Sequence, residues 1–133
     1  MTNGFVCAIL MGWAAHLSGY AQPPDCPEMR AVDRKDLQEV VCDGGTCRAA
    51  AHVHYDEPDV VYFWTEMHHT NPLARSVIVH EMVHVLQLYH GVIDADSSCE
   101  DKVKAEQEAY RIQEEYLITF GRMLETAARF ECH

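Results

Sequence analysis

The chain has 133 residues, a formal net charge of −11 and 48% apolar residues. This length suits one small domain and excludes a two-domain enzyme with a separate cofactor module. The acidic balance argues against nucleic acid and anionic membranes as partners, because both would repel the chain. Nine histidines and six cysteines are many for a chain of this size, so we look for the chemistry among them.

The first 21 residues differ in composition from the rest of the chain. They contain no Asp, Glu, Lys or Arg, and Phe5–Ala15 is an apolar run of signal-peptide length, too short to span a membrane. Gly19 and Ala21 are small residues at the −3 and −1 positions of a cleavage site. We therefore expect residues 1–21 to be a signal peptide that is cleaved before Gln22, and the mature protein to be secreted or periplasmic. The alternative is a buried N-terminal helix.

Cleavage at this point would remove Cys7 and leave five cysteines in the mature chain, which allow at most two disulfides. These five are Cys26, Cys42, Cys47, Cys99 and Cys132. Cys42 and Cys47 flank a turn-forming Asp-Gly-Gly sequence and are the favoured local pair. Cys47–Cys99 is a competing pair, and the sequence leaves the connectivity open.

The first half of the mature chain contains signals for a helix and a hairpin. Pro27 favours the first position of a helix, which we expect to run from residues 25–26 to about Val41. After a Gly-Gly turn, Arg48–Tyr55 and Asp59–Trp64 have the composition of two strands joined by a short turn. We therefore expect a small antiparallel hairpin.

Two longer helices are predicted in the second half. Asn71 is a good helix cap, Pro72 suits the first helical position, and Gly91 is the residue favoured just beyond a helix end. The last helix is expected to begin near residues 96–98 and to run to about Phe130. The predicted fold class is α+β: an N-terminal helix, a small antiparallel sheet, and two helices.

The first of these two helices contains an HExxH motif, His80-Glu-Met-Val-His84. Two imidazoles at positions i and i+4 lie one above the other on a helix, at a spacing that suits one zinc ion. Glu81 lies about 100° around the helix, where it can reach a metal-activated water without being a ligand. The surrounding helix is apolar on nearly all sides and therefore buried, and buried polar groups need partners. The alternative is a pair of core histidines that are bonded to neighbouring groups.

A zinc site of this kind needs a third protein ligand. On the last helix Glu106 falls inside the apolar arc together with Gln113. Glu108 points about 160° away from Glu106, among charged residues. Because a carboxylate on a buried face needs a partner, we choose Glu106 as the third ligand and keep Glu108 as the second choice.

Two segments of the chain resemble known zinc peptidases. The HEMVH segment at residues 80–84, followed by EQEAY at residues 106–110, resembles the HExxH…ExxA pattern of the gluzincin-type zinc metallopeptidases. Over about Cys47–Leu117 the chain is also similar to an uncharacterised family of small secreted bacterial HExxH proteins. The gluzincin resemblance implies that His80, His84 and Glu106 are zinc ligands and that Glu81 is the general base.

The resemblance carries two further expectations. Many gluzincins have an acid four residues after the third ligand, where it holds a ligand histidine, and here that position is Tyr110. Its hydroxyl could replace the acid by accepting from a ring N–H. The resemblance also implies that the strand before the metal helix, Val60–Trp64, edges the substrate cleft. It implies no substrate specificity.

Two other histidine pairs have weaker interpretations. His68 and His69, just before the metal helix, could help to hold an oxyanion, although an exposed loop is the simpler interpretation. His52 and His54 alternate on one strand face, which favours a solvated face, with a second metal site as the alternative.

We therefore interpret residues 22–133 as a single metallopeptidase-like domain with one Zn²⁺ per chain. Its expected activity is hydrolysis of a peptide or protein substrate, with no nucleic acid and no membrane as partner after signal cleavage. The alternatives are a secreted zinc-binding structural or interaction module without catalysis, and a disulfide-stabilised binding domain without metal. The sequence does not determine the oligomeric state.

Overall fold

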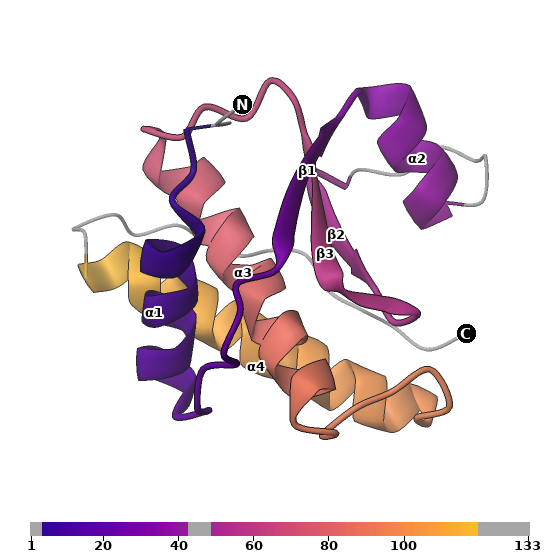
Figure 1. Cartoon of the computed structure of the whole chain (residues 1–133). Helices are drawn as coiled ribbons and strands as arrows, with labels where there is room; N and C mark the ends of the chain where they lie inside the picture. The colour runs from indigo at the N-terminus through magenta and orange to yellow at the C-terminus, as the bar shows by residue number, and fades with distance from the viewer. Residues whose placement is uncertain (1–3, 43–48, 120–133) are drawn as a thin grey trace.

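The computed structural model describes residues 4–42 and 49–119 (Figure 1). In these residues the elements follow in the order α1 (Cys7–Ser18), β1 (Glu28–Val32), α2 (Arg34–Cys42), β2 (Ala51–His54), β3 (Glu57–Trp64), α3 (Pro72–Tyr89) and α4 (Cys99–Thr119). The predicted α+β class is confirmed, because an N-terminal helix and a three-stranded mixed sheet precede two long helices.

The sheet has the strand order β1-β3-β2, so β3 is its central strand. The predicted hairpin is confirmed as the antiparallel pair β2–β3. The predicted helix from residue 26 is wrong over its first part, because Glu28–Val32 form β1 and pair in parallel with Val60–Trp64. This pairing uses the side of β3 that a hairpin leaves open. The helix begins only at α2, where the Asp33 carboxylate caps it by accepting from the backbone N–H of Asp36 at 2.7 Å.

The two faces of the sheet are covered by different helices. Val60 and Tyr62 of β3 are buried in a small cluster with Leu37 of α2. Val61 and Phe63, which alternate with them, belong to the main core, where α3 packs against the sheet. Figure 1 shows α3 between the sheet on one side and α1 and α4 on the other.

Helix α3 has the limits that its sequence predicts. The Asn71 side chain accepts from the backbone N–H of Leu73 at 2.9 Å and from that of Ala74 at 3.4 Å. Gly91, just beyond the helix end, has a φ of +71°, a conformation that glycine adopts without strain. Residues 78–87 are buried without interruption. Every polar side chain on this stretch therefore needs a partner inside the protein.

Helix α1 lies within the predicted signal peptide. Leu10, Met11 and Ala14 are buried, and the helix packs against α3 and α4. This arrangement corresponds to the buried N-terminal helix considered as the alternative. Cleavage before Gln22 stays a prediction.

The disulfide pattern differs from the one expected. Cys7, which was expected to leave with the signal peptide, is bonded to Cys26 in the structure. Cys99 is also disulfide-bonded. The predicted pair Cys42–Cys47 and the competing pair Cys47–Cys99 involve side chains outside the described part of the chain. Disulfides form in oxidising compartments, so the Cys7–Cys26 bond favours a location outside the cytoplasm.

Helix α4 begins where the sequence predicts. The Ser98 hydroxyl accepts from the backbone N–H of Asp101 at 3.1 Å and caps the helix. The predicted extension to Phe130 lies outside the described residues. Among the residues that the structure describes, no helix combines the length and apolar character needed to cross a membrane.

Candidate metal centre

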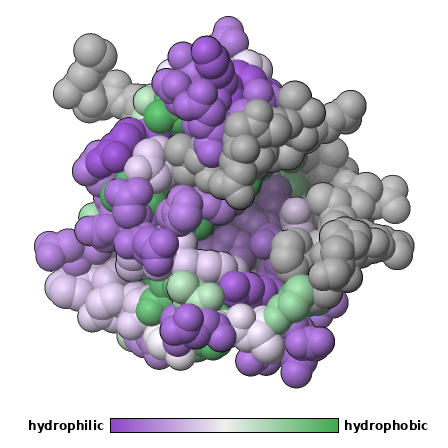
Figure 2. Space-filling view, turned by 90° about the vertical axis from the view of Figure 1, so that its right-hand side faces the viewer, coloured by the Kyte–Doolittle hydropathy of each residue, from purple (hydrophilic) through white to green (hydrophobic). Residues whose placement is uncertain are grey.

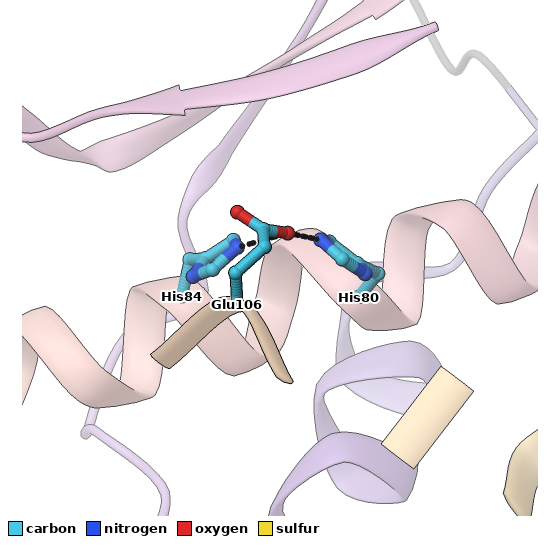
Figure 3. Close-up of side chains that lie close together, drawn as sticks. All are labelled: His80, His84 and Glu106. Atoms are coloured by element: carbon cyan, nitrogen blue, oxygen red, sulfur yellow. Dashed lines mark hydrogen bonds and ion pairs between the residues drawn. The ribbon is translucent and has the colours of Figure 1, made fainter. Parts of the chain in front are cut away.

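Two histidines of α3 and one glutamate of α4 form a cluster (Figure 3). One ligand atom from each of His80, His84 and Glu106 can be chosen so that all three lie within 4.8 Å of one another. Glu106 Oε1 is 2.5 Å from Nε2 of His80 and 3.3 Å from Nε2 of His84. The structure thus brings together the three residues that the sequence singled out as metal ligands.

The cluster is buried but not sealed. The His80 and His84 side chains are 7% and 10% exposed, whereas that of Glu106 is 25% exposed. Figure 3 shows strands above the cluster and α4 below it. The side of the molecule that faces right in Figure 1 has a hydrophilic hollow at its centre (Figure 2). The Glu106 side chain is therefore the most accessible of the three.

The side chain of Gln87 fixes Nδ1 of His84 as a hydrogen-bond donor. Gln87 Nε2 donates to the backbone carbonyl of Ala105 at 2.9 Å and to Glu108 Oε1 at 3.0 Å, and both of these oxygens are acceptors. The other end of the amide, Oε1, must then accept, and it lies 2.8 Å from His84 Nδ1. His84 Nδ1 is therefore the donor, which leaves Nε2 facing Glu106.

The side chain of Gln113 fixes Nδ1 of His80 as a hydrogen-bond donor in the same way. Ser76 donates its hydroxyl proton to the carbonyl of Leu73 at 2.6 Å, so its oxygen accepts from Gln113 Nε2 at 3.1 Å. Gln113 Oε1 must then accept from His80 Nδ1, which is 3.0 Å away. Both imidazoles are thus held with Nδ1–H directed at an amide oxygen and Nε2 directed at the same carboxylate, which is the orientation that a metal needs.

Sequence reasoning missed these two roles. The sequence places Gln113 on the buried face of the last helix but predicts no contact for it, and it predicts no role for Gln87. The available signal was a polar residue three positions after His84 on a helix that is buried on all sides. Tyr110, expected to accept from a ring N–H, instead packs its ring edge-on against His80, with 4.5 Å between the ring centroids.

The ionisation of the cluster follows from its geometry. Burial alone would raise the pKa of Glu106, but its hydrogen bonds to His80 and His84 outweigh burial and hold this pKa well below its usual range. Burial alone would lower the pKa of His84, but its hydrogen bond to Glu106 and the charges of Glu81 and Glu106 raise it to about 9. A proton on His84 Nε2 thus occupies the place of a cation, and a metal ion must displace it to bind.

Glu81, the predicted general base, lies beside the cluster. It is 7% exposed, and its Oε2 is 4.0 Å from His80 Nε2. Burial, followed by the charges of Glu106 and Glu81, raises the pKa of both Tyr55 and Tyr110. The phenols of Tyr55 and Tyr110 therefore lie within electrostatic reach of Glu106 and Glu81 and keep their protons at neutral pH.

The other candidates lie elsewhere. Glu108, the second choice as ligand, is outside the cluster and accepts from Gln87. His68 and His69 are exposed, with stacked rings. His52 and His54 are half-buried rather than solvated, and burial lowers the pKa of His52. Val60–Trp64, the strand expected to edge the substrate cleft, are part of β3, the central strand of the described sheet, whose edges are β1 and β2.

Comparison with known proteins gives a family but no function. Residues 3–127 match a family described as a domain of unknown function, DUF6647. The match includes α3 and α4 and also the whole of α1. No curated protein and no solved structure matches the chain.

Proposed function

The chain belongs to the DUF6647 family, and because the function of that family is unknown, we propose one from the site: zinc-dependent hydrolysis of peptide bonds outside the cytoplasm. His80, His84 and Glu106 hold the metal, and Glu81 is the general base. The observation that carries the proposal is the convergence of two oriented Nε2 atoms and one carboxylate next to a second, buried carboxylate.

The donor set fits zinc. A His₂Glu set with an open fourth position is characteristic of catalytic zinc. Zinc–ligand bonds of about 2.0–2.2 Å at tetrahedral angles place ligand atoms roughly 3.3–3.6 Å apart. The 3.3 Å between His84 Nε2 and Glu106 Oε1 agrees with this spacing. The shorter contact between His80 and Glu106, 2.5 Å, is a direct hydrogen bond that a metal would replace. Zinc supplies a Lewis acid that acidifies water and polarises a carbonyl.

The protein side chains would divide the remaining work. Glu81 takes a proton from the attacking water and later delivers it to the leaving amine, a role that its burial beside His80 supports. Gln87 and Gln113 hold the two imidazoles in place throughout. Tyr55 and Tyr110 keep their protons at neutral pH and remain hydrogen-bond donors near the reacting groups.

The test measures first the metal content of the protein and then its peptidase activity. Elemental analysis of the purified protein should find one zinc per chain; iron in its place would indicate a different use of the same two histidines and carboxylate. A mixed peptide library at neutral pH with added zinc should then be cleaved by the wild type. Glu81→Gln should keep its zinc and lose about 10²–10⁴-fold of the rate.

The outcomes separate the candidate functions. Equal cleavage by wild type and Glu81→Gln would assign the activity to other residues or to a contaminant. A wild type that holds zinc and cleaves nothing would favour a zinc-binding structural module. His68→Ala is the matched control, because it removes an exposed histidine and should change neither zinc content nor rate.

A further inference from the structure

We propose that Tyr20 and Glu108 are positioning residues of the metal centre, acting on His84 through Gln87. This inference rests on the proposed metal site and on retention of residues 1–21, and it extends the site to the N-terminal segment. It assigns a role to Glu108, which lies outside the three-residue cluster, and to Tyr20, which lies in the part of the sequence predicted to be a signal peptide.

A chain of hydrogen bonds joins these residues. The Tyr20 hydroxyl donates to Glu108 Oε1 at 2.7 Å, and Gln87 Nε2 donates to the same oxygen at 3.0 Å. The second amide hydrogen of Gln87 goes to the carbonyl of Ala105 at 2.9 Å. Both hydrogens are therefore used, and the amide oxygen can face only His84 Nδ1, 2.8 Å away.

The orientation of this amide decides which nitrogen of His84 is available. If the amide turned over, its NH₂ group would face Nδ1, which would then have to accept. The neutral imidazole would carry its proton on Nε2, the atom that faces Glu106, and could not offer that atom to a metal. Glu108 prevents this rotation, because after a flip it would face an amide oxygen, another acceptor.

Tyr20 is itself held in place at both ends. Its ring stacks on that of His90 at the end of α3, with centroids 5.7 Å apart and planes 19° from parallel. Its backbone N–H donates to the Ser18 hydroxyl at 3.2 Å, and His90 Nε2 contacts the carbonyl of Ala21 at 2.7 Å. The Tyr20 hydroxyl therefore reaches α4 from a fixed position and can restrain the Glu108 carboxylate.

The segment that carries Tyr20 is anchored as well. The Cys7–Cys26 disulfide brackets it, and α1 packs against both α3 and α4. The disulfide joins α1 to Cys26, just before β1, and the hydrogen bonds that converge on Glu108 join the segment after α1 to α3 and α4. In this arrangement the affinity of the metal centre depends on the N-terminal segment.

Three variants of the full chain test the proposal, each measured for Zn²⁺ affinity by competition with a chromophoric chelator. Glu108→Ala should weaken zinc binding by about 10–100-fold, the usual effect of removing a group that orients a metal ligand. Tyr20→Phe should weaken it by about 3–10-fold, since Gln87 keeps its bond to Glu108. Glu108→Gln should restore binding to within about 3-fold of wild type, because its amide oxygen can still accept both bonds. Tyr89→Phe, which removes the hydroxyl of a tyrosine that is 55% exposed, is the matched control.

A second readout does not depend on metal. In the metal-free protein, NMR of ¹⁵N-labelled histidine should show a His84 Nδ1–H that is protected from exchange with water. Protection should fall in Glu108→Ala and Tyr20→Phe and persist in Glu108→Gln and Tyr89→Phe. Wild-type protection and zinc affinity in Glu108→Ala and Tyr20→Phe would overturn the proposal. A wild type with a protected Nδ1–H that binds no zinc would overturn the proposed function and leave the positioning role standing.

Discussion

Helices α1 and α3 are both apolar on nearly all sides, but the fold covers them differently. In α3 residues 78–87 are buried without a break, because the sheet, α1 and α4 surround the helix. In α1 only Leu10, Met11, Ala14 and Ala15 are buried, and Ile9 remains 50% exposed. An all-apolar helix is therefore required at the position of α3, whereas at α1 a one-sided apolar stripe would be enough.

This difference explains where the chemistry lies. The polar side chains of α3 cannot reach bulk water, so each must find a partner, and His80, His84 and Gln87 find theirs on α4 or on α3 itself. Helix α1 has few polar side chains, and its buried residues pack against α3 and α4. Its apolar excess matches a leader sequence in composition, which is why the two interpretations of the segment compete.

The largest expected effect is loss of the metal from α3. His84→Ala or His80→Ala should abolish zinc binding, because the remaining histidine and Glu106 cannot complete a site. Removal of zinc by a chelator should also lower the melting temperature of the wild type, since a ligand that binds only the folded state stabilises it. Elemental analysis and thermal melting measure these effects. A wild type without zinc and without a chelator-dependent shift would contradict the metal site.

The next effect separates the two glutamates of α4. Loss of a residue that only orients a metal ligand weakens metal binding by about 10–100-fold. Glu106→Gln should weaken zinc binding by more than this, because it removes the negative charge of a ligand. Glu108→Gln keeps an acceptor for Gln87 and should retain the zinc. Chelator competition measures both affinities under the same conditions. The reverse order would show that Glu108 is the ligand.

The sequence was informative wherever the signal was local. Asn71, Pro72 and Gly91 define α3 through bonds that lie within a few residues of each end, and the phase of Glu106 on α4 follows from helix geometry alone. Strand β1 and the Cys7–Cys26 bond were missed because each depends on a segment distant in the chain. The role of Gln87 was missed for a related reason: its partners Ala105 and Glu108 become its neighbours only when α3 and α4 pack together.

A smaller effect tests whether α1 is part of the working protein. Leu10 is 2% exposed, and Leu10→Ala should cost about 2–5 kcal/mol of unfolding free energy if α1 is retained. Ile9→Ala, on the exposed side of the same helix, is the matched control and should cost less than about 0.5 kcal/mol. Denaturant unfolding of the exported protein measures both. If cleavage occurs before Gln22, neither variant will differ from wild type, and mass spectrometry will place the N-terminus at that residue.

The smallest expected effect concerns stability at alkaline pH. Burial, followed by the hydrogen bond to Glu108, raises the pKa of Tyr20 to about 12, from 10.0 in an unperturbed tyrosine. Above pH 10 the unfolded chain loses this proton first, so the stabilisation by Tyr20 is complete below that pH and is lost as the pH rises towards 12. Other buried tyrosines also make the free energy of unfolding fall as the pH rises. Tyr20→Phe should remove only the part of this fall that comes from Tyr20. Chemical unfolding at several pH values between 9 and 12 measures the slope, and Tyr89→Phe should leave it unchanged. Identical slopes for wild type and Tyr20→Phe would mean that the tyrosine does not hold Glu108 in the folded protein, and the link between the N-terminal segment and the metal centre would then be absent.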